Sequence, residues 1–175
     1  MQIETERLVL RSSQSFDAQA LAEIWSDPEV TLYMGGPRDF AETRELFEEE
    51  ALSGAETNTD LWPVIEKTSG QVIGHCGLID KDVDGQSEYE LVYVFHTSAW
   101  GKGYATEAAS AVRDYAFEQL DLKRIIALID PENAASERVA KKIGMHFERK
   151  TCRPSGKVLR VYARHAYVTS EAAYR

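Results

Sequence analysis

Trp100-Gly101-Lys102-Gly103-Tyr104-Ala105-Thr106-Glu107-Ala108 joins a strand-like run, Tyr89 to Phe95, to a long helical pattern that begins near Gly103. A glycine-rich turn from a strand into a helix points several backbone N–H groups at one place, and the helix N-terminus adds partial positive charge there. Glycine at positions 101 and 103 permits backbone angles and a close approach that a side chain would block. The stretch therefore predicts a site for the phosphate or pyrophosphate of a cofactor.

Two familiar phosphate loops do not fit this stretch. A P-loop places Ser or Thr directly after its Gly-Lys pair, whereas Lys102 is followed by Gly103. A dinucleotide fingerprint needs a third glycine where this chain has Thr106, and no βαβ unit surrounds it. The alternative is a glycine turn that only caps a helix.

A longer pattern decides between these readings. The stretch resembles the acetyl-CoA loop of the GNAT N-acetyltransferase superfamily, Gln/Arg-x-x-Gly-x-Gly/Ala, with Trp100 in the first place, then Gly103 and Ala105. Its full form, W-G-K-G-Y-A-T-E-A, is similar to the branch that holds the ribosomal-protein N-terminal acetyltransferases. One strand further on, Asn133 to Met145 resembles the family segment N-x-x-S-x-x-V-x-x-K-x-G-F/M. The beginning, residues 4–11, also resembles the first strand of this branch, so the resemblance runs from residue 4 to about residue 168.

Hydrophobic periodicity gives a mixed α and β chain without repeats or linkers. Strands are predicted at residues 3–11, 61–66, 71–80, 87–96, 123–129, 145–152 and 158–168, and helices around 21–25, 39–52, after 103 and after 133. This order fits the GNAT fold. The resemblance implies a single α+β domain over residues 1–175, with a splayed, mostly antiparallel mixed sheet of about seven strands and about four helices.

The resemblance also assigns the cofactor contacts, with acetyl-CoA as the cosubstrate. Backbone amides of the turn would hold its pyrophosphate, namely those of Gly101, Lys102, Gly103, Tyr104, Ala105 and Thr106. The pantetheine amides would pair with the backbone of Tyr93, Val94 and Phe95 as if with another strand. Asn133 would hydrogen-bond pantetheine or a water, or would only cap the fourth helix.

The chemistry of amine acetylation indicates which further groups are needed. An alkyl ammonium has a pKa of about 10 and must lose a proton before it attacks a thioester. Glu90, in the sequence Glu90-Leu91-Val92-Tyr93, matches a glutamate of the branch and is the first candidate base, with Tyr89 and His75 as weaker candidates. The tyrosine that protonates the thiolate in many superfamily members is replaced by Ala140, so Ser136 is the candidate acid. For Glu90 and Ser136 alike, a purely structural role remains the alternative.

Charge leaves the acceptor amine undecided. The predicted second helix is acidic and could attract an ammonium group, while the terminal strands are basic and could bind the adenosine phosphate or an anionic acceptor. The acidic set is Asp39, Glu42, Glu45, Glu48, Glu49 and Glu50, and the basic set is Arg149, Lys150, Arg153, Lys157, Arg160 and Arg164. Each set could equally be a solvated face.

Composition narrows the remaining classes of function. The 175 residues are 43% hydrophobic, as in a globular domain, and the net charge of −9 argues against nucleic-acid binding. Two distant cysteines and four histidines show no spacing for a metal site, and no segment indicates secretion or membrane spanning, so a cytoplasmic location is expected. Whether the protein forms a homodimer is left undecided.

The leading interpretation is an acetyl-CoA-dependent N-acetyltransferase that acts on a primary amine, either a protein N-terminus or a small molecule. A non-catalytic acyl-CoA-binding or sensing module and a structural protein on the same fold are the alternatives.

Overall fold

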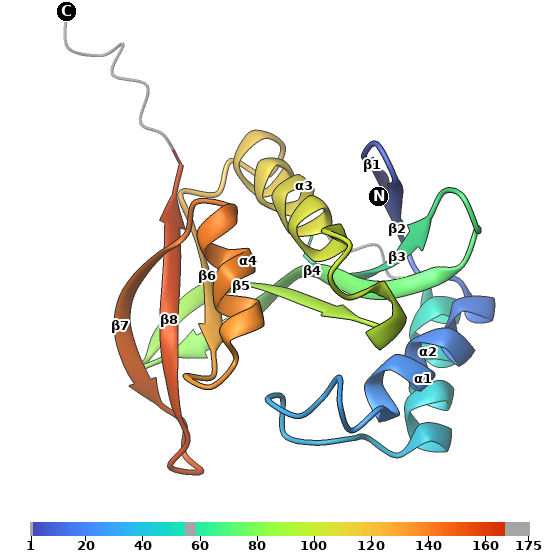
Figure 1. Ribbon diagram of the computed structural model, residues 1–175, viewed down its shortest axis with the longest axis horizontal. Helices are drawn as coiled ribbons and strands as arrows, with labels where there is room; N and C mark the ends of the chain where they lie inside the picture. The colour runs from blue at the N-terminus through green and yellow to red at the C-terminus, as the bar shows by residue number, and fades with distance from the viewer. Residues whose placement is uncertain (1, 55–58, 167–175) are drawn as a thin grey trace, which may run out of the picture.

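The computed structural model describes residues 2–54 and 59–166, which form one twisted sheet with helices on both of its faces (Figure 1). The mixed α+β class and the four α-helices agree with the sequence prediction. The elements run β1 (Gln2–Glu4), β2 (Leu8–Arg11), α1 (Ala18–Ser26), α2 (Phe40–Ser53), β3 (Leu61–Glu66), β4 (Val72–Val83), β5 (Gln86–Phe95), α3 (Tyr104–Glu118), β6 (Arg124–Ile129), α4 (Ala134–Lys142), β7 (His146–Cys152) and β8 (Val158–His165). Residues 167 and 168 of the last predicted strand lie outside the described residues.

The sheet has eight strands in the order β1-β2-β3-β4-β5-β6-β8-β7, and among these neighbours only β5 and β6 are parallel. This is one strand more than the predicted number of about seven, and the difference lies at the start of the chain. Residues 3–11 are not one strand but the antiparallel pair β1–β2, with Gln2 opposite Arg11. The two strands are joined by a tight turn, closed by a hydrogen bond from the Thr5 amide to the Leu8 carbonyl. The alternation of apolar residues continues through this turn, so the sequence pattern did not reveal it.

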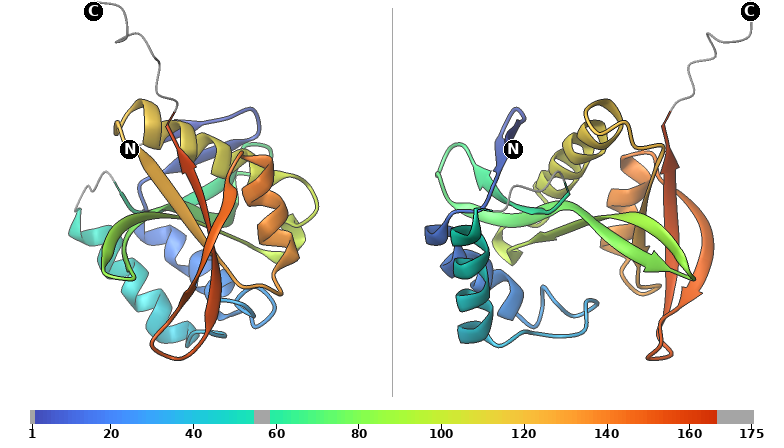
Figure 2. Two further views of the ribbon diagram at one scale, coloured as in Figure 1. Left: turned by 90° about the vertical axis from the view of Figure 1, so that its left-hand side faces the viewer. Right: turned by 180° about the vertical axis from the view of Figure 1, so that it is seen from behind.

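The two helix pairs cover opposite faces of the sheet, as the view from behind in Figure 2 shows. One core cluster contains α3 and α4 together with Leu91 and Phe95 of β5, and another contains α1 and Phe47 of α2 together with Val94. Alternate residues of β5 thus serve opposite layers, as the two-residue period of a strand requires. No helix among residues 2–54 and 59–166 is long and apolar enough to cross a membrane.

The sheet parts in its middle. β4 and β5 pair from Val83–Gln86 to Gly74–Phe95, which covers the whole of β5. On its other side, β5 pairs with β6 in parallel register at Glu90–Ile126 alone among the described residues. Beyond Glu90, residues 91–95 therefore form an open strand edge in the interior of the sheet. This opening places the candidate functional site.

Candidate functional site

A cleft of about 640 Å³ lies where β5 and β6 separate. Its lining comes from five places: the α1–α2 loop, β5, the turn before α3 together with the first residues of α3, the end of β6 with the residues after it, and α4 along its length. The predicted site residues that line it are Glu90, Tyr93, Val94, Phe95, Gly101, Gly103, Tyr104, Ala105, Thr106, Asn133 and Ser136. Lys102 is the one residue of the predicted set that does not line it. Predicted residues from Glu90 to Ser136 are thus brought to one space.

The glycine turn has the geometry that its sequence predicts. Gly101 and Gly103 adopt φ values of 73° and 84°, which side chains rarely tolerate, and Gly103 is the N-cap of α3. The bond from the Glu107 amide to the Gly103 carbonyl is an early bond of the helix, so the amides of Tyr104, Ala105 and Thr106 have no acceptor inside it. These amides lie at the cleft, where they can bind an anion.

The turn is held from behind by the N-terminal strand pair. Glu107, in the first turn of α3, accepts hydrogen bonds from Thr5 Oγ1 at 2.6 Å and from the Arg7 amide at 2.9 Å. Arg7 also pairs with Glu107 and donates from Nη1 to the Lys102 carbonyl at 2.9 Å. Burial raises the pKa of Glu107, but these hydrogen bonds outweigh it, so that the net pKa is lowered. The turn therefore has a fixed position before any ligand arrives.

Trp100 explains why the loop departs from the Gln/Arg pattern. Its indole Nε1 donates to the carbonyl of Phe95 at 2.8 Å, which ties the loop to the end of β5. That carbonyl belongs to the edge predicted to pair with pantetheine, and one of its two lone pairs is already occupied. Sequence reasoning did not anticipate this bond, because it treated position 100 only as a mismatch.

Glu90 lies at the point of separation, on the same face of β5 as Val92 and Val94. Its side chain is buried, with 8% of the residue exposed, and burial raises the pKa of its carboxyl group. Lys81, on the neighbouring strand β4, opposes this rise, with Nζ 4.0 Å from Glu90 Oε2. A buried carboxylate with raised proton affinity beside a cleft has the properties of a general base.

Ser136 meets an unforeseen partner on the other side of β5. Its Oγ donates to the Tyr93 hydroxyl at 2.9 Å, and that hydroxyl donates to the Ser136 carbonyl at 2.9 Å. Asn133 caps α4 by accepting from the Ser136 amide at 3.0 Å. Burial raises the pKa of Tyr93. The sequence assigned Tyr93 a backbone role only, although strand alternation placed its side chain opposite to that of Glu90, toward α4.

Arg138 and Lys142 were also missed. They lie one turn apart on α4 and both line the cleft, so their cationic groups are available to phosphate. The signal in the sequence was their spacing of four residues on a capped helix. Neither of the two charge sets singled out from the sequence lines the cleft. Several of the basic residues are paired with acids instead, among them Arg149 with Asp84 and Arg160 with Glu137.

The weaker base candidates lie apart from the cleft lining. His75 is buried behind α1, where its Nδ1 accepts from Trp25 Nε1 at 3.1 Å, and burial lowers its pKa to about 4. Tyr89 packs against the main core and is not among the lining residues. The part of the chain that the structure describes contains no cluster of His, Cys, Asp and Glu suited to a metal ion.

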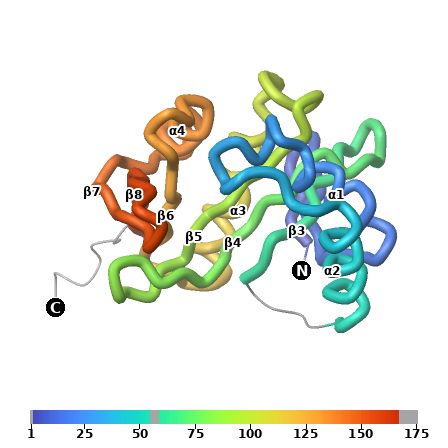
Figure 3. Tube along the Cα trace, turned by 90° about the horizontal axis from the view of Figure 1, so that it is seen from below, coloured from blue at the N-terminus to red at the C-terminus, as the bar shows by residue number. Residues whose placement is uncertain are grey.

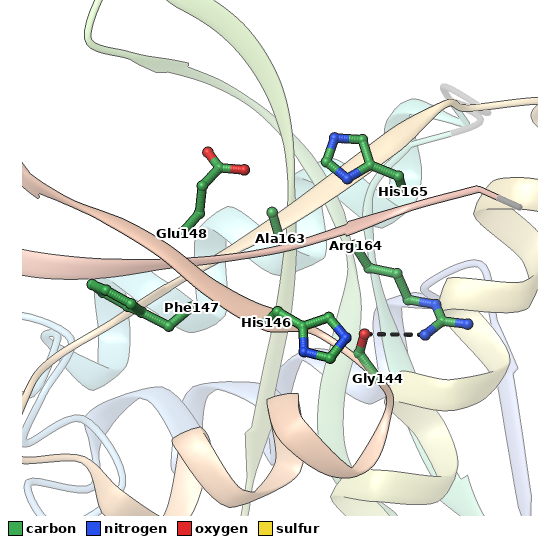
Figure 4. A pocket seen from close by; sticks show the side chains of 7 residues that line it. All are labelled: Gly144, His146, Phe147, Glu148, Ala163, Arg164 and His165. Atoms are coloured by element: carbon green, nitrogen blue, oxygen red, sulfur yellow. Dashed lines mark hydrogen bonds between the residues drawn. The ribbon is translucent and has the colours of Figure 1, made fainter.

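A second hollow, of about 370 Å³, lies over β7 and β8 and shares no residue with the cleft (Figure 4). Three of its polar side chains are engaged in the structure. Arg164 donates to the Gly144 carbonyl at 3.0 Å, and Glu148 and His165 both contact Arg124. This hollow therefore offers few groups for binding or catalysis. The cleft, by contrast, combines the N-terminal amides of α3, the buried carboxylate of Glu90 and the hydroxyls of Tyr93 and Ser136.

Comparisons with known proteins agree with this geometry. A family model described as "Acetyltransferase (GNAT) domain" matches residues 7–146. In Bacillus subtilis (strain 168), YkkB is 38% identical over 93% of this chain and 95% of its own length, and the N-acetyltransferase YnaD is 37% identical over 89% and 90%.

Solved structures share the fold. A GNAT-family acetyltransferase from Bacillus anthracis superimposes with a TM-score of 0.81 and 34% identity over 94% of this chain and 98% of its own. RimL, a ribosomal L7/L12 α-N-protein acetyltransferase solved in complex with coenzyme A, shares the fold alone, with a TM-score of 0.75 and 16% identity over 95% and 98% of the two chains. The chain therefore belongs to the GNAT family of N-acetyltransferases.

Proposed function

We propose that this protein, as a single domain over residues 1–175, transfers an acetyl group from acetyl-CoA directly to a primary amine in a ternary complex. One observation carries the proposal: the sheet opens beside an anion-binding turn, with a buried carboxylate on one side of β5 and a pair of hydroxyls on the other. An acceptor and a thioester that enter from opposite sides would meet between these groups.

The residues present fit coenzyme A. The amides of residues 101–106, supported by Lys102, would bind the pyrophosphate, with Arg138 and Lys142 adding positive charge from α4. The open edge at Tyr93, Val94 and Phe95 would hydrogen-bond the pantetheine amides, and Asn133 would lie beside that arm. Acetyl-CoA supplies the activated acetyl group.

Glu90 would accept the proton of the incoming ammonium, which gives the amine the lone pair that attacks the thioester carbon. Ser136, hydrogen-bonded to Tyr93, would give its proton to the departing thiolate and would regain one from the second proton that the nitrogen loses as the amide forms. Glu90 would release the first proton to water, so that the reaction yields the amide, the thiol and one proton. A cysteine nucleophile is not needed. Cys76 is buried, which raises its thiol pKa, and Cys152 lies on a distant strand. Two free thiols also fit the reducing cytoplasm as the location.

Two measurements test this function. Titration calorimetry should show binding of acetyl-CoA, and a thiol-release assay with a panel of amines, checked by intact mass of candidate peptides, should show turnover. Binding without turnover on any amine would favour the acyl-CoA-sensing alternative. Absence of binding would leave only a structural role for the fold.

A further inference from the structure

We infer that the acceptor is a small primary amine with an apolar body and without a carboxylate, such as an arylalkylamine. This inference rests on the proposed function and concerns the acceptor half of the same cleft. It depends on the loop between α1 and α2, residues 27–39, and on the charges around it.

The acceptor half is lined by apolar side chains from that loop. Seen from below, the loop lies across β5 between α1 and α4 (Figure 3). Val30, Leu32, Tyr33 and Met34 line the cleft, and Leu32 and Met34 are 61% and 45% exposed. Large apolar side chains exposed at the rim of a cleft are typical of ligand-binding surfaces. Methionine also adapts its shape to different apolar partners.

These side chains are displayed by an ordered loop. Thr31 is fully buried, donates from Oγ1 to the Asp27 carbonyl at 2.7 Å, and accepts from the Met34 amide at 2.8 Å. The loop returns through Arg38, whose amide donates to the Trp25 carbonyl at 3.0 Å. The hydrogen-bonded backbone of the loop thus holds Leu32 and Met34 in exposed positions.

Lys157 connects this loop to the opposite wall. Its Nζ donates to the Tyr33 carbonyl at 3.1 Å and pairs with Asp130, at the end of β6, at 2.9 Å. This bridge joins Tyr33 and Asp130, two residues that line the cleft from different elements. Because the bridge fixes these two lining elements relative to each other, the cleft suits a small molecule better than a protein terminus, which would need them to separate.

Charge gives the rest of the specificity. The lining residues on the acceptor side include the acids Glu29, Glu90 and Asp130. Asp130 is paired with Lys157 at 2.9 Å, and Lys81 lies farther from Glu90, at 4.0 Å. The cations among the lining residues, Arg138 and Lys142, lie on α4 with the cofactor contacts. An ammonium group is therefore favoured near Glu90. A carboxylate on the acceptor would be desolvated there beside like charge.

Matched amines separate these features in a thiol-release assay with acetyl-CoA. 2-Phenylethylamine has the apolar body and one charge, phenylalanine adds a carboxylate, and putrescine lacks the apolar body. A short peptide with an N-terminal alanine represents a protein terminus. We expect kcat/KM for 2-phenylethylamine to exceed that of each of the other three by about tenfold or more.

Variants of the loop then locate the effect. Leu32→Ser and Met34→Ser should each raise KM for 2-phenylethylamine about fivefold to tenfold, with the Kd of acetyl-CoA unchanged. Leu52→Ser is the matched control, because Leu52 is 76% exposed on α2 and does not line the cleft. A higher kcat/KM for phenylalanine, putrescine or the peptide would overturn the acceptor inference and leave the transferase function standing. Failure to acetylate any amine would overturn both.

Discussion

Replacing Glu90 with glutamine tests the proposed chemistry most directly. The change keeps the shape of the side chain and removes the group that accepts the amine proton. Glu90 is buried, and burial raises the pKa of its carboxyl, so it is a stronger base than an ordinary carboxylate. A positioned base contributes about 10²- to 10⁴-fold to the rate. We therefore expect kcat/KM for the amine to fall at least about 10²-fold, with the Kd of acetyl-CoA unchanged.

The pH profile should identify Glu90 as the source of this effect. Wild-type kcat/KM should decline on the acid side as Glu90 takes up a proton, with the inflection above 4.5 because burial raises its pKa. In Glu90→Gln that acid limb should be missing. The residual rate should then rise with pH as the free amine accumulates toward its own pKa of about 10.

Lys81 provides an internal check on the magnitude. Its Nζ lies 4.0 Å from Glu90 Oε2 and lowers the pKa of Glu90. At this distance the Coulomb energy is about 1 kcal/mol in water and larger in a protein interior. Lys81 is 32% exposed, so we use the lower figure, which corresponds to a factor of about five. Lys81→Met should therefore lower kcat/KM about fivefold on the acid limb, where Glu90 is protonated more readily, and leave it unchanged at alkaline pH.

A thiol-release assay in a series of buffers of constant ionic strength gives kcat/KM as a function of pH for both variants. A Glu90→Gln enzyme with wild-type kcat/KM from about pH 6 to about pH 9 would refute the reasoning and leave Glu90 a structural residue. An acid limb that does not move in Lys81→Met would show that another group titrates there.

Three further predictions concern the cofactor turn, the proton donor and the anchor of α3. Gly103→Val forces valine into a φ of 84° and should weaken acetyl-CoA binding by at least about 2 kcal/mol in calorimetry, whereas Gly85→Val, at a φ of 78° in the β4–β5 turn at the opposite end of β5, should leave the Kd unchanged. Ser136→Ala should lower kcat by up to about 10²-fold without changing that Kd, and an unchanged kcat would reduce Ser136 to a helix first-turn residue. Glu107→Gln should cost about 1 kcal/mol of unfolding free energy at neutral pH. Because the folded pKa of Glu107 is lowered, this difference should shrink as pH falls below the ordinary carboxyl range, and a Tm difference that is independent of pH would contradict it.

The sequence predicted the site correctly where the residue type that the chemistry needs also determines the local backbone conformation. Glycines 101 and 103 predicted positive φ and a helix N-terminus, and both occur. The two-residue period of a strand also implies opposite faces of β5 for Glu90 and Tyr93, but this implication was not drawn, and the packing of Tyr93 against the main core was missed. The turn at Thr5–Arg7 was missed because it depends on Glu107, about a hundred residues away, rather than on turn-forming residues.

Long-range pairing was the main limit of the sequence reasoning. The acidic pattern of the second helix can be read from the sequence, but the position of this helix relative to the cleft cannot. That position depends on the packing of α2 against α1, which composition does not predict. The basic terminal strands suggested a phosphate site because their partners, such as Asp84 and Asp130, lie in other elements. The apolar rim at Leu32 and Met34 gave no periodic signal, because it belongs to an irregular loop.

The position of Trp100 allows ligand binding in the cleft to be followed by the protein's intrinsic tryptophan fluorescence. Of its three tryptophans, Trp25 and Trp62 are 4% and 2% exposed, while Trp100 is 47% exposed, lines the cleft and bonds to the end of β5. An indole in water emits at longer wavelength than one in a protein core, so the red edge of the emission comes mainly from Trp100. A ligand that enters beside it should change that edge alone, and occupancy of the cleft can then be followed in solution without a label.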